Sequence, residues 1–251
     1  MTAATATDYA AFVSGIGFEF IQPETPLEPA SYELLKVALG AYGACVDAVN
    51  TRLGPDEALI KERLRDLLPI PRMSTLAVAA ILNRAVGEMD PAHAFVNVGV
   101  WQGFTLLAGM AGNPDKICIG VDDFSQFGGP RAEFYERFRQ RRSPRHRFFD
   151  MDYREYFACM HEEPIGVYLY DGDHGYEDQR LGLELAEPFF ADGCIVVVDD
   201  TNCEEPRQAT LDFVARSRAA WEILLDRRTS ANGHPTFWNG LMVLRRGRSR
   251  S

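Results

Sequence analysis

Residues 167–202 read VYLYDGDHGYEDQRLGLELAEPFFADGCIVVVDDTN. Two apolar runs in this stretch have the length and composition of buried strands, Val167–Tyr170 and Cys194–Val198. An amphipathic helical segment that ends at Pro188 separates them. Strand, helix and strand in this order give two parallel strands joined by a right-handed crossover. Both carboxyl ends therefore open onto the same edge of a sheet, where open α/β folds bind their ligands.

Acidic residues directly follow both of these strands. Asp171 comes after the first and Asp199-Asp200 after the second, and His174 lies three residues past Asp171. Carboxylates that meet at one sheet edge repel one another unless a cation holds them together. We therefore predict a divalent metal site with oxygen ligands and a histidine beside it. The alternative for Asp199-Asp200 is an ordinary strand-end turn, and Asp173 is expected to cap the following loop or helix.

The pattern of the chain changes near residue 90. Before that position, residues 1–28 lack periodicity and are expected to form an irregular arm. Helical spacing of apolar residues then predicts three helices: Ser31–Arg52, Pro55–Leu68, and Met73–Met89 with Ser74 or Thr75 as its cap. We expect residues 1–90 to form an arm and helical cap, residues 91–246 a catalytic domain, and residues 247–251 a frayed basic tail.

After residue 90, short apolar runs alternate with helical segments. This alternation predicts an α/β fold with a doubly wound, mostly parallel sheet that ends in an antiparallel pair. Seven strands are expected, at Ala94–Val98, Ile117–Val121, Arg147–Phe149, Val167–Tyr170, Cys194–Val198, Glu222–Leu225 and Leu241–Leu244.

A glycine-bearing turn, VGVWQGFT, follows the first of these strands at residues 98–105. Gly99 and Gly103 let the backbone turn tightly and approach a ligand, although G-x-x-x-G is equally typical of packing and is not the dinucleotide fingerprint G-x-G-x-x-G. Asp122 follows the second strand, where a carboxylate can bind ribose hydroxyls, and its neighbour Asp123 is the alternative. The acidic run Asp150–Tyr153 follows the third strand. Together these features predict a cofactor that contains a nucleoside.

These motifs resemble those of class I S-adenosylmethionine-dependent methyltransferases with a Rossmann-like fold. They are most similar to the metal-dependent O-methyltransferases that include catechol, caffeoyl-CoA and macrolide-sugar enzymes. The resemblance covers residues 73–246, and D-G-D-H-x-Y followed by D-D is its most specific part. It implies S-adenosylmethionine and Mg²⁺ as cofactors, and these site residues: Gly99, Gly103 and Thr105 at the methionine end, Asp122 at the ribose, Asp152 and Tyr153 beside the adenine, Asp171, Asp199 and Asp200 as metal ligands, and His174 as general base.

The sequence departs from that family pattern at two positions. Asn97 stands where many members carry Glu or Asp. Asp200 stands where the catechol and caffeoyl-CoA enzymes have Asn, whereas the sugar-modifying relatives keep two acids. The second departure favours a sugar or natural product as the hydroxyl-bearing acceptor.

Two other functions use the same residues. Asp171-Gly172-Asp173 is also a D-x-D element, which many glycosyltransferases use to bind a metal and a nucleotide sugar. The other alternative is a non-catalytic, methyltransferase-like binding protein. Such a protein is expected to lack the candidate metal ligands and the candidate base, but this sequence has them. We therefore expect an enzyme.

The remaining histidines and two tryptophans have no predicted role in the site, or have one that structural packing would equally explain. His93, His146 and His161 are expected to be solvated, and His234 belongs to a loop that could cover the substrate. Trp101 and Trp238 could line the site or simply pack.

Composition limits the partners and the location of the protein. The chain has 251 residues, 46% of them apolar, and a net charge of −10, which argues against nucleic acid as a partner. The arginine-rich stretch Arg131–Arg147 could bind an anion, but a solvated helix face is favoured. Five cysteines without C-x-x-C spacing and the lack of a signal sequence or a long apolar run predict a cytoplasmic protein with no membrane partner. The N-terminal helices are expected either to cover the cofactor or to join subunits of a homo-oligomer.

Overall fold

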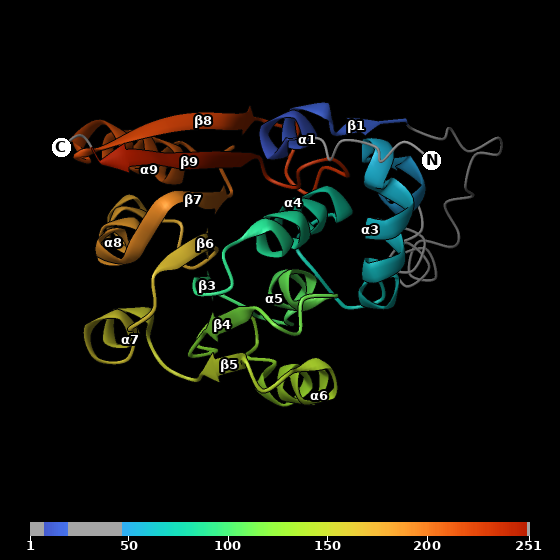
Figure 1. Ribbon diagram of the computed structural model, residues 1–251, viewed down its shortest axis with the longest axis horizontal. Coiled ribbons are helices and arrows are strands. Elements are labelled where there is room, and N and C mark those ends of the chain that lie inside the picture. The colour runs from blue at the N-terminus through green and yellow to red at the C-terminus, as the bar shows by residue number, and fades with distance from the viewer. Residues whose placement is uncertain (1–7, 20–46, 250–251) are drawn as a thin grey trace.

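The computed structural model describes residues 8–19 and 47–249. A seven-stranded sheet forms its centre, in the order β5-β4-β3-β6-β7-β9-β8 (Figure 1). Neighbours from β5 to β7 pair in parallel, and β9 runs antiparallel to both β7 and β8. The predicted doubly wound sheet with an antiparallel end is confirmed. Its strands are β3 (Ala94–Val98), β4 (Ile117–Val121), β5 (His146–Phe149), β6 (Ile165–Tyr170), β7 (Phe190–Asp199), β8 (Ala219–Arg227) and β9 (Leu241–Ser249).

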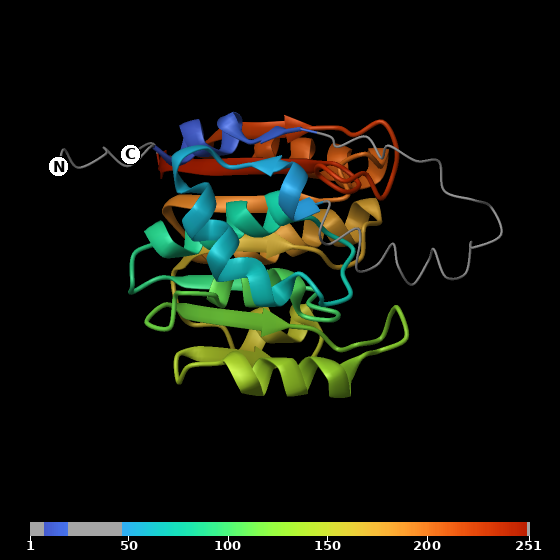
Figure 2. The same cartoon turned by 90° about the vertical axis from the view of Figure 1, so that its right-hand side faces the viewer.

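Helices cover both faces of the sheet (Figures 1 and 2). One layer contains α4 (Leu76–Glu88), α5 (Phe104–Met110) and α6 (Arg131–Arg141), and the other contains α7 (Tyr153–Cys159), α8 (Tyr176–Ala186) and α9 (Glu204–Arg216). Successive side chains of a strand point to opposite faces, so each central strand supplies both cores. In β6, for example, Leu169 packs in the core on the α4 side and Tyr168 in the core on the α8 side. Because helices bury both faces of these strands, the strands are continuous apolar runs in the sequence.

The N-terminal region is more regular than predicted. Residues 9–18 form α1 (Tyr9–Gly15) and the short strand β1 (Gly17–Phe18), so the predicted irregular arm is wrong there. Much of the predicted helix Ser31–Arg52 lies outside the described residues, and its last two residues form strand β2 (Thr51–Arg52), which pairs with β1. The predicted second helix is present as α3 (Glu57–Leu64), flanked by the 3₁₀ turns Gly54–Asp56 and Arg65–Leu67.

A residue distant in the sequence caps α4. Neither predicted hydroxyl performs this role: Thr75 donates its hydroxyl to the carbonyl of Thr236, at 2.6 Å, and the Ser74 hydroxyl makes no hydrogen bond. The carboxylate of Asp47 instead accepts the Leu76 N–H at 2.6 Å. This bond joins the N-terminal region to the helix that packs on the sheet, beside the sheet edge described below.

Two other predictions concern the end of the chain and membranes. β9 extends to Ser249, so residues 247–249 continue a strand rather than fraying. In the part of the chain that the structure describes, no helix is long and apolar enough to cross a membrane.

Candidate functional site

The register of the sheet brings four strand ends together. Val98 pairs with both Val121 and Tyr170, and Tyr170 pairs with Val198. The next position of each strand or loop therefore lies at one sheet edge: Gly99, Asp122, Asp171 and Asp199. A cavity of about 470 Å³ opens there, lined by residues from the glycine turn, from the loop after β4 and from the ends of β6 and β7. The sequence prediction that these elements share one site is consistent with this cavity.

The glycine turn packs directly against the carboxylate side of the site. Gly99 has φ +77°, and a Cβ atom at this position would overlap the backbone carbonyl of Asp171. Gly99 is therefore required for contact with the neighbouring strand end as well as for the turn. Below the turn, the buried Asn97 accepts a hydrogen bond from the Thr105 hydroxyl at 2.8 Å and donates to the carbonyl of Gly99 at 2.8 Å. The neutral Asn97 side chain therefore stabilises the glycine turn through these two hydrogen bonds.

Replacing Gly99 by alanine should disrupt the site more than backbone strain alone would. A Cβ in a left-handed conformation costs about 1–2 kcal/mol, and an overpacked contact adds about 1–3 kcal/mol. Gly193 provides a matched control, because its φ is +80° and a Cβ there meets nothing within 4 Å. We expect Gly99→Ala to lower the free energy of unfolding, measured by urea denaturation, about 2–3 times as much as Gly193→Ala does. Equal losses for the two variants would contradict the contact with Asp171.

The carboxylate of Asp122 organises the loops of the site. Its Oδ2 accepts the N–H groups of Val100 and Trp101, at 2.7 and 2.8 Å, and its Oδ1 accepts the N–H of Phe124 at 2.7 Å. Asp122 thus ties the glycine turn to the loop after β4. Asp123 also lines the cavity, and its side chain accepts the N–H of Ser125 at 2.9 Å. Both candidate ribose-binding carboxylates therefore lie at the predicted place.

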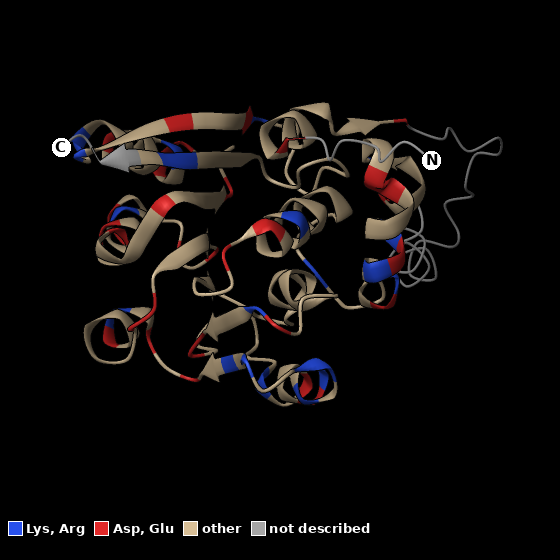
Figure 3. Cartoon of the chain, in the orientation of Figure 1, with Lys and Arg blue, Asp and Glu red and all other residues tan. Residues whose placement is uncertain are grey.

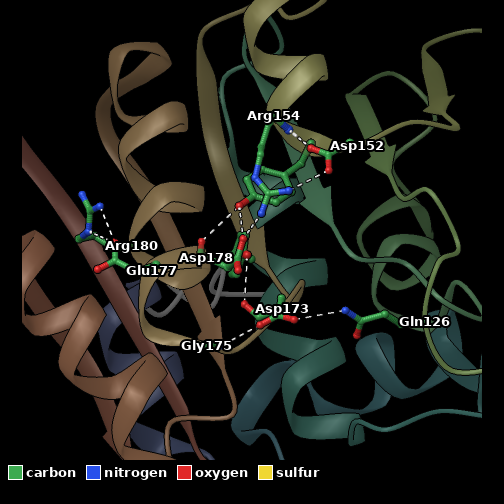
Figure 4. Close-up of polar contacts among 10 residues, drawn as sticks. Gln126, Asp152, Arg154, Asp173, Gly175, Glu177, Asp178 and Arg180 are labelled. Carbon is green, nitrogen blue, oxygen red and sulfur yellow. Dashed lines mark hydrogen bonds and ion pairs between the residues drawn. The ribbon is translucent and has the colours of Figure 1, made fainter.

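Polar side chains that contact one another line the end of the cavity beyond β5 (Figure 4). Asp152 caps α7 by accepting the N–H of Arg154 at 2.7 Å, and it forms an ion pair with the Arg154 guanidinium at 3.0 Å. The same guanidinium pairs with Asp178 of α8 and lies 4.9 Å from the centre of the Tyr153 ring. The predicted adenine-binding pair, Asp152 and Tyr153, is therefore in the cavity wall, held by Arg154 and Asp178.

The opposite end holds the carboxylates and the histidine predicted from residues 167–202. His174 Nε2 lies 3.7 Å from Asp171 Oδ1 and 3.5 Å from Asp200 Oδ2. Asp199 is 5% exposed, and its Oδ1 has no hydrogen-bond partner. Asp200 has φ +56°, a conformation that is uncommon for a residue with a side chain and that occurs preferentially at functional sites. The structure thus brings all four predicted residues to one end of the cavity.

These groups strongly perturb one another. Burial raises the pKa of Asp199 well above its usual range, and the charges of Asp171 and Asp200 add to this effect. Burial also raises the pKa of Asp171. Burial lowers the pKa of His174, but its interaction with Asp171 and the nearby charges of Asp200 and Asp199 outweigh burial and raise this pKa to about 9. Such perturbed groups in a cavity are typical of functional sites.

Asp173 has the structural role that the sequence favoured. Its Oδ1 accepts the N–H of Gly175, the residue before α8, at 2.8 Å, and its Oδ2 accepts a hydrogen bond from Gln126 at 3.3 Å (Figure 4). Because this carboxylate holds two loops together, the D-x-D alternative loses support. Over residues 8–19 and 47–249, no three Asp, Glu, His or Cys side chains are arranged closely enough to hold a metal ion.

Several side chains differ from expectation or had not been predicted. His146 and His161 are buried, so their predicted solvation is wrong. The His146 ring makes a hydrogen bond with the carbonyl of Asn113, and the His161 ring makes one with the hydroxyl of Tyr156. Trp101 and Trp238 both line the cavity. Lining residues for which no role in the site was predicted include Arg72, Ser74, Phe127, Arg154, Asp178 and Asn239. They come from loops and helix ends, where no periodic pattern marks them.

The arginine-rich stretch forms α6 and the segment after it, blue in Figure 3. Arg139 pairs with Glu136 on the same helix, and Arg131 pairs with Asp150 at 3.1 Å. Arg139 is exposed. These contacts are those of the solvated helix face favoured by the sequence.

Comparison with known proteins gives the domain type and the fold. Residues 96–201 match the family model described as a methyltransferase domain. The fold is similar to that of cofactor-bound Rv0187 from MTB, with a TM-score of 0.56 and 13% identity over 90% of this chain and 100% of that one. It is also similar to an O-methyltransferase from Bacillus cereus in complex with SAH, with a TM-score of 0.51 and 14% identity over 83% and 97% of the two chains.

A third similar structure is the O-methyltransferase TomG from Streptomyces achromogenes, with a TM-score of 0.51 and 11% identity over 76% of this chain and 89% of that one. No curated protein sequence matched the chain. At these identities the structures establish a shared fold, and the family model establishes the domain type. Residues 96–201 thus match a methyltransferase domain, and the seven-stranded sheet around them has the Rossmann-like fold of these methyltransferase structures.

Proposed function

We propose that this enzyme transfers the methyl group of S-adenosylmethionine to a hydroxyl oxygen of a small molecule, with a sugar or other natural product as the favoured acceptor. The observation that carries the proposal is that one cavity joins the glycine turn to the cluster of Asp171, Asp199, Asp200 and His174. A cofactor bound along the turn would direct its methyl group toward an acceptor held beside the carboxylates.

In this proposal, six residues hold the cofactor. The turn residues Gly99, Gly103 and Thr105 border its methionine part, Asp122 accepts hydrogen bonds from the ribose, and Asp152 and Tyr153 flank the adenine. Asp122 supports this assignment because it already aligns the turn with the loop after β4. The cofactors in the similar structures, SAH in the Bacillus cereus enzyme and SAM in TomG, support the same donor.

Asp171, Asp199 and Asp200 would hold a divalent cation, with Mg²⁺ favoured because all three donors are carboxylate oxygens. The unpartnered Oδ1 of the buried Asp199 and the uncommon backbone of Asp200 support this role. The three side chains would have to turn toward one another to share one ion. A bound Mg²⁺ lowers the pKa of a coordinated hydroxyl and orients its oxygen.

His174 is proposed to accept the proton that the hydroxyl loses. Its ring lies between Asp171 and Asp200 and is partly exposed to the cavity, with 24% of the side chain accessible. Its Nδ1 has no hydrogen-bond partner. At a pKa of about 9 the ring is protonated at neutral pH, so it can serve as a base only where positive charge offsets the neighbouring carboxylates. We therefore propose that His174 acts as a base only when the neighbouring cation site is occupied.

Methyl transfer to a panel of acceptors tests the proposal. The purified protein would be incubated with methyl-labelled S-adenosylmethionine and with sugars, catechols and polyketides that carry vicinal hydroxyls, in Mg²⁺ or in EDTA. We expect O-methylated product in Mg²⁺, little in EDTA, and recovery when Mg²⁺ is restored. Transfer that EDTA leaves unchanged would count against the cation, and label on nitrogen or carbon would count against the hydroxyl acceptor.

A further inference from the structure

The segment that leads into α4 contributes a buried cation to the cavity. Arg72 lines the cavity, although its side chain is only 10% exposed. One terminal nitrogen pairs with Asp47 at 3.1 Å, and the other donates to the carbonyl of Leu68. Its Nε has no hydrogen-bond partner. Because an unpaired buried N–H is costly, this donor points to an acceptor that is supplied from the cavity.

A second unpaired donor lies two residues further along. Ser74 also lines the cavity and is 7% exposed, and its hydroxyl has no hydrogen-bond partner. Its neighbour Thr75 differs, because that hydroxyl already donates to Thr236. Two buried donors, one of them charged, therefore line the same wall of the cavity without acceptors.

The contacts of Arg72 place this wall at one end of the site. Its guanidinium carbon lies 4.8 Å from the centre of the Phe104 ring, and Phe104 directly follows Gly103. Among the described residues that line the cavity, Arg72 and Arg154 are the only lysines or arginines. Arg154 is held by Asp152 and Asp178, beside the proposed adenine site. Phe104 lines the cavity as well, so an anionic ligand group bound beside Phe104 would meet Arg72.

We propose that Arg72 and Ser74 form a carboxylate subsite that binds the amino-acid carboxylate of the cofactor. This inference rests on the proposed function, which places the methionine part beside Gly103. Arginine suits the role because its N–H groups form strong, directional bonds to a carboxylate. The N-terminal region would thereby contribute to cofactor binding through Arg72, which Asp47 holds in place. An acidic group on the acceptor is the other source of a carboxylate, and the experiment distinguishes the two.

The test compares two ligands in three proteins by calorimetry. The ligands are S-adenosylhomocysteine and its decarboxylated analogue, which keeps the amine. The proteins are the wild type, Ser74→Ala, and the double variant Asp47→Asn/Arg72→Gln, which avoids leaving Asp47 buried without its partner. We expect the wild type to bind S-adenosylhomocysteine about 10- to 150-fold more tightly than the analogue. The ratio should fall in Ser74→Ala and approach 1 in the double variant, while affinity for the analogue changes little.

Ser74→Ala keeps the test informative if the double variant is unstable, because it removes a hydroxyl that makes no hydrogen bond. An undiminished ratio in folded variants that still bind S-adenosylhomocysteine would overturn the subsite and leave the proposed function standing. A ratio near 1 in the wild type, with the variants raising KM only for acidic acceptors, would overturn the cofactor assignment in favour of the acceptor. A wild type that binds neither ligand would overturn both proposals.

Discussion

His174→Ala is expected to reduce kcat for methyl transfer at least about 100-fold, the usual scale for losing a general base. The affinity for S-adenosylmethionine should change less than about 2-fold, because His174 pairs with Asp171 and Asp200 and is not one of the residues proposed to hold the cofactor. Single-turnover kinetics in saturating Mg²⁺ would measure the chemical step, and calorimetry the affinity. The matched control is His93→Ala, the same substitution before β3, which should leave both quantities unchanged.

The pH dependence gives this prediction a second readout. In the protein without a bound cation, His174 has a pKa raised to about 9 and carries a proton at neutral pH. Cation binding should lower this pKa, so the rising limb of the pH–rate profile should move to lower pH as Mg²⁺ increases. The limb should be absent in His174→Ala. An unchanged kcat in this variant would remove His174 from the mechanism.

Asp199→Asn is expected to abolish activity and its dependence on Mg²⁺ together. Asn preserves the shape of the side chain but removes the charge that a bound cation needs most, because Asp199 is the most buried of the three carboxylates. The matched control is Asp192→Asn, on the same strand, where the carboxylate pairs with Arg246 at the surface. The control should retain wild-type activity and Mg²⁺ dependence. A fully active Asp199→Asn enzyme that EDTA does not inhibit would contradict the metal site.

Stability measurements should separate this loss from misfolding. The raised pKa of Asp199 means that its ionised form is unfavourable in the folded protein, so this group lowers stability as the pH rises through the range where it ionises. Without Mg²⁺, the Asn variant should therefore be more stable than the wild type at neutral pH, by about 0.5–2 kcal/mol. Added Mg²⁺ should raise the Tm of the wild type and of Asp192→Asn, but not that of Asp199→Asn.

Much of the sheet could be predicted because its signals are local. Ala94–Val98 and Ile117–Val121 were predicted with the boundaries that the structure has, since each is a short apolar run between polar turns. The meeting of Asp171 with Asp199 also followed from local information, because a right-handed crossover puts both strand ends on one edge. Asp173 was predicted to cap a loop, and it does so.

Contacts between distant segments could not be predicted. Asp47 caps α4 across 29 residues of sequence, and nothing near Asp47 indicates the partner. The sequence explained Gly99 by a turn and a ligand, whereas the structure adds the backbone of Asp171 as a close neighbour. His146 lies in a basic stretch typical of a surface, yet tertiary packing buries it. The cavity position of Arg72 likewise depends on how the segment before α4 crosses the sheet edge.

Calorimetric binding of S-adenosylmethionine, with and without Mg²⁺ and compared with binding of a UDP-sugar, tests whether the cavity is a methyl-donor site. We predict micromolar binding of S-adenosylmethionine and no binding of the UDP-sugar, since the cavity joins a glycine turn and candidate ribose carboxylates to the cluster around His174. The absence of S-adenosylmethionine binding, together with Mg²⁺-dependent binding of the UDP-sugar, would rule out a methyltransferase and make Asp171-Gly172-Asp173 a glycosyltransferase element.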